Sequence, residues 1–134
     1  MRWYKLFVVK NKGIRRMPKE NKVVVSIINY IKSLPYSTCE KVQGTALSSG
    51  KADINACVRG RFVRIEVKTL DHNNTPSKKQ LINLKRWASC GAVCIVAYTV
   101  DDVKAVITEK GTFKKQYIKN YGNGMVSQRI VVKD

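Results

Sequence analysis

Apolar side chains recur every three or four residues in two parts of the chain, the spacing of one face of an α-helix. The first stripe follows Pro18, a residue suited to the first helical position, and stops before Pro35. Its members are Val24, Ile27, Ile28, Ile31 and Leu34. The second stripe, Leu81, Leu84 and Ala88, predicts a helix over 77–90 that Gly91 ends. Asp101 and Asp102 favour a third helix reaching about Glu109, because carboxylates stabilise helix N-termini.

Runs of β-prone residues predict the strands of a sheet. Residues 53–58 and 62–68 form two such runs, and the short Arg59-Gly60 link between them favours a hairpin. Residues 93–98 are continuously apolar, as in a buried strand. Further strands are expected at 3–9, 42–47 and 128–133. Helices and strands in this order predict an α/β fold with one central mixed β-sheet flanked by helices.

The charge of the chain narrows the kind of partner. The 134 residues carry a formal net charge of +17, and 44% of them are hydrophobic, which argues against global disorder. A domain this basic is expected to bind a polyanion. Nucleic acid is the first candidate for this partner, and an anionic membrane is the second. No apolar run approaches the ~20 residues of a membrane span, and no signal-peptide pattern is present. We therefore expect a protein with no membrane partner that is cytoplasmic or nucleoid-associated.

Four cysteines and a single histidine do not favour a zinc site. Cys39, Cys57, Cys90 and Cys94 have gaps that fit no paired zinc knuckle, and His72 is the only histidine. Reduced thiols are expected in a cytoplasmic protein. A structural zinc site is therefore not expected.

The predicted hairpin brings two carboxylates together. If Arg59 and Gly60 form the turn, Asp53 lies directly opposite Glu66, where two carboxylates repel unless a cation or a shared proton lies between them. Strand alternation places Lys68 beside Glu66 and turns the apolar residues of the same strand toward the core. Two carboxylates suit Mg²⁺, and a neighbouring ammonium suits phosphodiester hydrolysis. The alternative is a solvent-facing strand with an ordinary Glu-Lys pattern, and a longer loop would shift the register.

These residues resemble the PD-(D/E)XK nuclease signature. Gly50-Lys51-Ala52-Asp53 is followed, after twelve intervening residues, by Glu66-Val67-Lys68. Ala52 stands where the family name has proline. Pro18-Lys19-Glu20, residues 44–50 and the 75–80 segment opening the next helix are similar to the VRR-NUC branch. The resemblance covers about 18–106 of a single 1–134 nuclease domain and implies a restriction-endonuclease-like fold. Residues 1–17 and 111–134 would be terminal extensions that contain strands.

The resemblance implies a role for each site residue. Asp53, Glu66 and the main-chain carbonyl of Val67 would bind Mg²⁺ or Mn²⁺, with Lys68 as the catalytic base or stabiliser. Glu20 and Gln80 would support the site from the two helices. Glu20 could instead serve only its helix dipole, and Ser77 with Gln80 has the spacing of a capping box. Nucleic-acid contacts are expected from Lys51, Arg64, Lys78 and Lys79.

The resulting hypothesis is a metal-dependent DNA endonuclease acting on duplex or branched DNA such as four-way junctions. The alternatives are a non-catalytic nucleic-acid-binding module with the same fold, and a basic RNA-associated protein. A symmetric homodimer is expected because one site cuts one strand, and terminal strands could pair between copies. Those strands could instead extend the sheet of their own chain. Tyr117 and Tyr121, set among lysines, could stack on unpaired bases or belong to the core.

Overall fold

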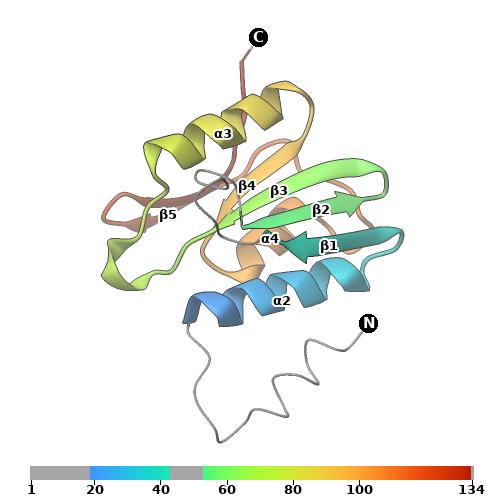
Figure 1. Ribbon diagram of the computed structural model, residues 1–134, viewed down its shortest axis with the longest axis horizontal. Coiled ribbons are helices and arrows are strands. Elements are labelled where there is room, and N and C mark those ends of the chain that lie inside the picture. Colours follow the sequence, from blue (N-terminus) through green and yellow to red (C-terminus); the bar gives the residue numbers. More distant parts are fainter. Residues whose placement is uncertain (1–18, 43–52, 134) are drawn as a thin grey trace, which may run out of the picture.

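A six-stranded sheet forms the centre of the computed structural model, which describes residues 19–42 and 53–133 (Figure 1). In this part of the chain the helices are α2 (Lys19–Ser33), α3 (Lys78–Ser89) and α4 (Val100–Val106), with a short 3-10 turn, η2 (Asp71–Asn73). The strands are β1 (Ser37–Lys41), β2 (Ile54–Val58), β3 (Arg61–Val67), β4 (Val93–Ala97), β5 (Ile118–Gly122) and β6 (Met125–Arg129).

The sheet is mixed, with the strand order β1-β2-β3-β4-β6-β5. Only the central pair, β3 and β4, is parallel, and the other four pairs are antiparallel. The parallel pair needs a crossover, which α3 supplies. The predicted α/β fold with helices flanking one mixed sheet is therefore confirmed.

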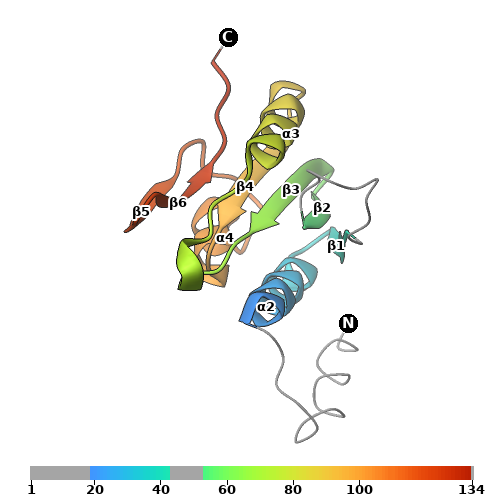
Figure 2. The same ribbon diagram turned by 60° about the vertical axis from the view of Figure 1, so that its left-hand side comes forward.

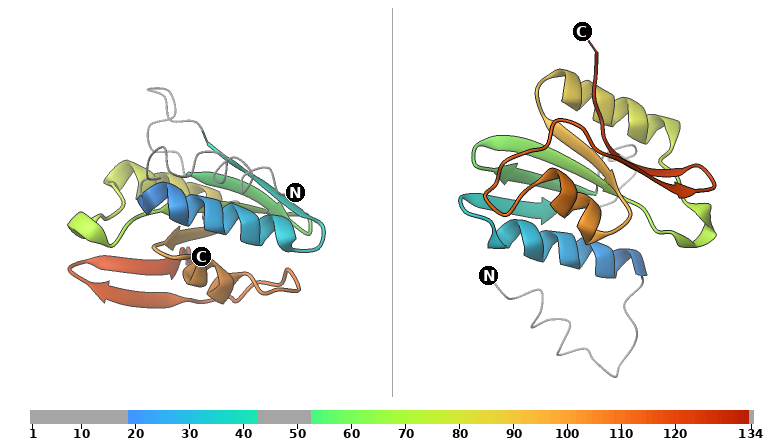
Figure 3. Two further views of the ribbon diagram at one scale, coloured as in Figure 1. Left: turned by 90° about the horizontal axis from the view of Figure 1, so that it is seen from below. Right: turned by 180° about the vertical axis from the view of Figure 1, so that it is seen from behind.

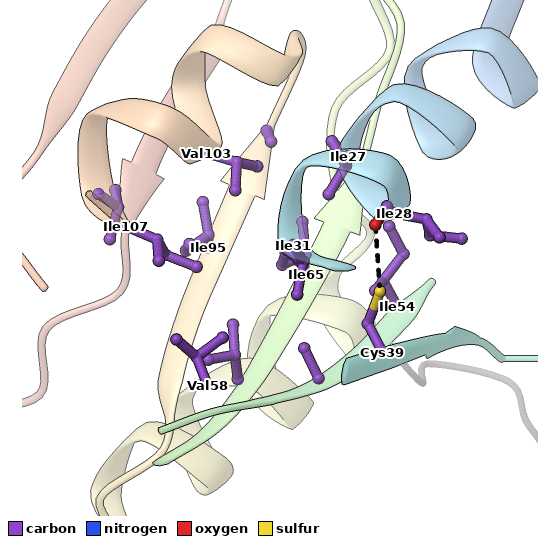
Figure 4. Close-up of a cluster of buried hydrophobic side chains, with 14 of the residues drawn as sticks. Ile27, Ile28, Ile31, Cys39, Ile54, Val58, Ile65, Ile95, Val103 and Ile107 are labelled. Carbon is purple, nitrogen blue, oxygen red and sulfur yellow. Dashed lines mark hydrogen bonds between the residues drawn. The ribbon is translucent and has the colours of Figure 1, made fainter. Parts of the chain in front are cut away.

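Helices cover both faces of the sheet. The apolar stripe of α2 packs with α4 against one face, where it meets residues of β2, β3 and β4 (Figure 4). Leu84 of α3 lies on the opposite face with Cys94 and Val96 of β4. Figure 2 shows α3 and α2 on opposite sides of the sheet, and the view from behind in Figure 3 shows α4 beside α2. The site residues on β3 thus lie inside a layered structure rather than on an open sheet.

The β2–β3 hairpin has the predicted register. Val58 pairs with Arg61 and Ile54 with Ile65, and Arg59 and Gly60 form the turn with φ values of 49° and 84°. Positive φ at both central residues is the geometry that joins tightly twisted strands through two residues. Asp53 follows the last pair of the ladder, so the turn fixes its position relative to Glu66.

The structure differs from the predicted elements in two places. β1 is a strand that the sequence pattern does not predict, because only Cys39 is buried in it and its other residues are too polar to stand out. Of the strand expected at 42–47, only Val42 is described, just after β1, and it donates its backbone N–H to the Asp53 carbonyl at 2.7 Å; residues 43–47 lie outside the described residues. The third helix is shorter than expected, because Ile107 is extended and forms a bridge with Phe113.

The C-terminal segment adds two strands to the sheet instead of the one expected at 128–133. β5 and β6 form a hairpin through Asn123 and Gly124, with φ values of 54° and 79°. Asn-Gly is a strong hairpin signal that could have revealed β5 in the sequence. β6 pairs with β4 on one side and β5 on the other, so it extends the sheet of its own chain. It is therefore not available to pair with a second copy, and the strand predicted at 3–9 lies outside the described residues.

All four cysteines are free thiols, two of them buried. The Sγ of Cys39 contacts the Ile28 carbonyl at 3.7 Å (Figure 4), and burial raises the pKa of both Cys39 and Cys94 to about 11. These two thiols act as small core side chains. No helix in 19–42 or 53–133 combines the length and apolarity that crossing a bilayer requires.

Candidate active site

Asp53 and Glu66 meet where β2 begins and β3 ends. Glu66 is buried, with 1% of its surface exposed, and Asp53 is half-buried. The backbone N–H of Val67 donates to Asp53 Oδ2 at 2.8 Å, which fixes the Asp53 carboxylate beside the neighbouring Glu66. The opposition predicted from the hairpin is thus present in the structure, and both groups belong to one local unit.

Glu66 is held in an environment that disfavours its charge. Burial, reinforced by the negative charge of Asp53, raises the pKa of Glu66 to about 9, although Lys68 works in the opposite direction. Within the described residues, Glu66 Oε1 has no hydrogen-bond donor. A buried, unpartnered carboxylate oxygen is costly, and a proton shared with Asp53 or a bound cation would remove the cost.

Lys68 lies on the same side of β3 as Glu66. Its Nζ is 3.5 Å from Glu66 Oε2, and 17% of its side-chain surface remains exposed. The backbone N–H of Lys68 donates to the Ala97 carbonyl at 2.9 Å, which ties this end of β3 to β4. An ammonium group is therefore held beside the carboxylate pair while keeping access to solvent.

Gln80 reaches the site from the first turn of α3 and serves two partners. Its Nε2 donates to Glu66 Oε2 at 2.9 Å, while its Oε1 accepts from the backbone N–H of Ser77 at 2.7 Å. Ser77 Oγ in turn accepts from the backbone N–H of Gln80 at 3.1 Å, which completes a capping box. The two interpretations weighed for Gln80 are thus present together, since one amide caps the helix and contacts the carboxylate.

The connection from Lys68 to α3 is fixed by hydrogen bonds between segments that are distant in the sequence. Tyr98 Oη donates to the Asn74 carbonyl at 2.7 Å, and Asn123 Nδ2, at the tip of the β5–β6 hairpin, donates to Asn73 Oδ1 at 3.2 Å. Asn74 Nδ2 also donates to Thr69 Oγ1 at 2.7 Å. These contacts span up to 50 residues of sequence, so no local pattern could have revealed them.

The C-terminal hairpin is anchored by Asp102, which is 1% exposed. Tyr117 Oη and Tyr121 Oη donate to Asp102 Oδ1 at 2.7 and 2.9 Å. The backbone N–H groups of Tyr98 and Thr99 donate to Asp102 Oδ2 at 2.8 and 3.0 Å. Burial and the Asp102 carboxylate raise the pKa of Tyr117. Both tyrosine hydroxyls are therefore committed to the interior, which favours the core interpretation over base stacking.

Arg64 is buried rather than presented to solvent. It is 5% exposed, its Nε donates to Asn55 Oδ1 at 3.1 Å, and its Nη1 donates to Asn83 Oδ1 at 2.8 Å. Its guanidinium lies 4.0 Å from the ring centroid of Trp87, which stacks on Phe62. The expected contact between Arg64 and nucleic acid does not suit this placement. We assign Arg64 to the packing of α3 against the sheet.

The structure describes only some of the remaining predicted site residues. Glu20 lies in the first turn of α2, and its side chain is outside the described part of the structure, as is the whole of Lys51. Lys78 and Lys79 are exposed in the first turn of α3, next to Gln80.

The donor set suits a hard divalent cation better than zinc. Asp53 and Glu66 supply carboxylate oxygens, and the main-chain carbonyl of Val67 follows Glu66 directly along the chain. Glu66 Oε1, which has no donor in the part of the chain that the structure describes, could be satisfied by a bound cation. In ranges 19–42 and 53–133, no three or more His, Cys, Asp or Glu side chains gather as a metal cluster. Any metal here would depend on two carboxylates with main-chain and solvent oxygens.

A mixed sheet with a carboxylate pair, an adjacent lysine and a glutamine from the crossover helix defines a nuclease-like α/β domain. The chain is similar to a solved structure described as a "VRR_NUC domain", with 26% sequence identity and a TM-score of 0.55. The match covers 66% of this chain and 92% of that one. The resemblance to the VRR-NUC fold is thereby confirmed. No family model matches the chain, and no curated protein matches it.

Proposed function

We propose that this protein is a Mg²⁺- or Mn²⁺-dependent DNA endonuclease that hydrolyses phosphodiester bonds at Asp53, Glu66 and Lys68. The observation that carries the proposal is the buried Glu66, whose Oε2 is held by Gln80 and Lys68 while its Oε1 finds no donor among residues 19–42 and 53–133. A domain that only binds nucleic acid has no need of so costly an arrangement.

The site residues would have two roles. Some would bind the metal, and others would offset the negative charge of the phosphate. Asp53, Glu66 and the Val67 carbonyl would hold the metal, with Glu20 in support. The metal, when bound, would lower the pKa of water and polarise a phosphoryl oxygen. Lys68 would orient the attacking water and offset the negative charge that develops on the phosphoryl oxygens. Gln80 would keep Glu66 in place. Water would add to phosphorus and give up one proton as one P–O ester bond breaks, and the leaving oxygen would take up one proton, so that the step balances.

The substrate we propose is duplex or branched DNA, for example a four-way junction, bound with the help of Lys51, Lys78 and Lys79. We further propose a symmetric homodimer, since paired cuts in two strands need two sites in fixed relation. Light scattering at moderate salt tests the dimer. A monomer that persists when bound to a junction would refute the dimer without affecting the nuclease assignment.

Cleavage by Glu66→Gln tests the activity itself, because the amide keeps the size of the side chain and removes its charge. We expect cleavage of linear, branched or single-stranded DNA in Mg²⁺ or Mn²⁺ to fall by orders of magnitude. DNA binding in EDTA should be retained, because the raised pKa of Glu66 keeps the metal-free carboxyl protonated near neutral pH, and the substitution then changes little charge. Glu109→Gln, at an exposed position, carries the same charge change and should cleave like wild type. Equal cleavage by wild type and Glu66→Gln would overturn the assignment of the activity to this site, and an absence of cleavage by wild type would leave the non-catalytic binding module as the function.

A further inference from the structure

The outward face of α3 is basic along its whole length. Lys78, Lys79, Ile82, Lys85 and Arg86 are all exposed, at positions that recur on one side of a helix, whereas Leu84 faces the sheet. The helix contains no aspartate or glutamate. We call these five residues the α3 basic face.

Helix electrostatics do not explain the lysines at its start. A helix N-terminus carries partial positive charge, so carboxylates are favoured in the first turn and lysines are not. α3 has Lys78 and Lys79 there and no acidic residue to offset them. Arg86 lies in the last turn, where a cation is favoured, and so has a structural reason of its own. Helix electrostatics give no structural reason for Lys78, Lys79 and Lys85. We attribute these three lysines to the binding of an external anion.

This face is directly linked to the candidate active site. Gln80, in the same first turn as Lys78 and Lys79, donates to Glu66. The N-terminal end of α3, which carries Lys78 and Lys79, is therefore the end that lies beside Glu66. From Lys78 to Arg86 the helix rises about 12 Å, at ~1.5 Å per residue. That length corresponds to roughly three or four base pairs at ~3.4 Å each.

The face is suited to phosphates rather than to unpaired bases. Binding of single strands depends on aromatic rings on which bases stack. Trp87 is the only aromatic residue of α3, and its ring is engaged by Phe62, with ring centroids 4.8 Å apart, and by the Arg64 guanidinium. Cationic side chains without a free ring favour the backbone of a duplex.

We infer that the α3 basic face binds the sugar-phosphate backbone of duplex DNA on one side of the scissile bond. On this inference the DNA backbone would follow α3, the helix labelled in Figure 1, from the Gln80 end toward its C-terminal end. This inference rests on the proposed function for its position relative to the cut, but it concerns binding and not turnover.

Salt-dependent binding of a short duplex in EDTA tests the inference. Each phosphate contact contributes about 0.9 to the slope of log affinity against log salt concentration. We expect Lys85→Gln to reduce the slope by about 1 and Lys85→Gln/Arg86→Gln by about 2. The matched control is Lys104→Gln/Lys110→Gln, which removes the same charge at exposed positions in and just after α4. Thermal unfolding confirms that each variant is folded.

The outcomes separate this inference from the nuclease assignment. A slope unchanged from wild type, an equal fall in the α4 control, or an equal loss for single-stranded DNA would each overturn the duplex-binding face. The reduced slope specific to α3 supports it even if wild type proves not to cleave DNA, which would overturn only the proposed catalysis.

Discussion

Gln80 donates its Nε2 hydrogen to Glu66 Oε2 across 2.9 Å, and the other end of the same amide caps the helix that carries it. The start of α3 and the buried carboxylate are therefore positioned by a single side chain. Helix capping and placement of Glu66 can be separated by mutation, because Ser77 takes part in the first and not in the second.

Comparing Gln80→Ala with Ser77→Ala should separate the two roles. Loss of a capping interaction typically costs ~0.5–2 kcal/mol, so both variants should unfold more easily, and Gln80→Ala at least as much as Ser77→Ala because buried Glu66 also loses a donor. Only Gln80→Ala also removes the donor to Glu66, and we expect only this variant to lower the cleavage rate under conditions where both are folded. Chemical denaturation and single-turnover cleavage measure the two effects. A cleavage defect of equal size in Ser77→Ala would assign the loss to the helix end.

The environment of Glu66 predicts how stability depends on pH. Its pKa is raised to about 9 from an ordinary 4.5, so the folded state binds an extra proton between these values. The free energy of unfolding of the metal-free protein should therefore fall as pH rises from about 5 to about 9. Thermal unfolding in EDTA measures this dependence.

Glu66→Gln is the control for this pH dependence because it cannot ionise. The variant should lose the decline in stability attributable to Glu66 and be more stable than wild type at pH 9. Added Mg²⁺ should flatten the wild-type curve, since a bound cation competes with the proton. Parallel curves for wild type and variant in EDTA would contradict the raised pKa.

We expect Arg64 to contribute to the free energy of unfolding rather than to DNA affinity. Arg64→Lys loses the planar group that contacts Asn55, Asn83 and Trp87, and leaves buried polar atoms unpaired. We expect a loss of about 1–3 kcal/mol in the free energy of unfolding. Arg86→Lys, at an exposed position, should change it by no more than about 0.5 kcal/mol. If folded Arg64→Lys lost DNA affinity at unchanged stability, Arg64 would have to be returned to the nucleic-acid surface.

Asp102 should control the order of the C-terminal hairpin. Asp102→Asn replaces an oxygen that accepts two hydrogen bonds with an NH₂ group. That NH₂ group is itself a donor, and it would face either the two tyrosine hydroxyls or the two backbone N–H groups that donate to Asp102. Amide hydrogen exchange should accelerate in β5 and β6 more than in β2 and β3. Asp101→Asn makes the same charge change at an exposed neighbour and should leave exchange as in wild type. Uniform acceleration over all strands would show that Asp102 stabilises the whole domain rather than the hairpin.

The parts of the fold that follow from local rules were predictable from the sequence. The α2 and α3 helices follow from their apolar stripes, and the hairpin register follows from two turn residues with positive φ. That register alone brings Asp53 to Glu66. By contrast, β1 is a short edge strand with a single buried side chain, so it leaves almost no hydrophobic pattern.

The burial of the site was not predictable in the same way. Alternation along β3 correctly separates Val63, Ile65 and Val67 from Arg64 and Glu66, but it does not say what covers the second face. The second face is covered by α3 and the crossover connection that carries it. This is a tertiary arrangement, which a local pattern cannot reveal. The links from Asn123 to Asn73 and from Tyr98 to Asn74 likewise depend on segments that meet only in the folded chain.

The place of β6 has a consequence for how the protein can fold during its synthesis. β4 is buried along its whole length, and its neighbour on the side away from β3 is β6, which follows it by about thirty residues in the sequence. Until residues 125–129 have left the ribosome, one edge of β4 has unpaired backbone groups. The nascent domain is thus open to aggregation until β6 has emerged and paired. A tag or fusion joined directly after β6 should reduce the yield of folded protein more than one joined through a flexible spacer.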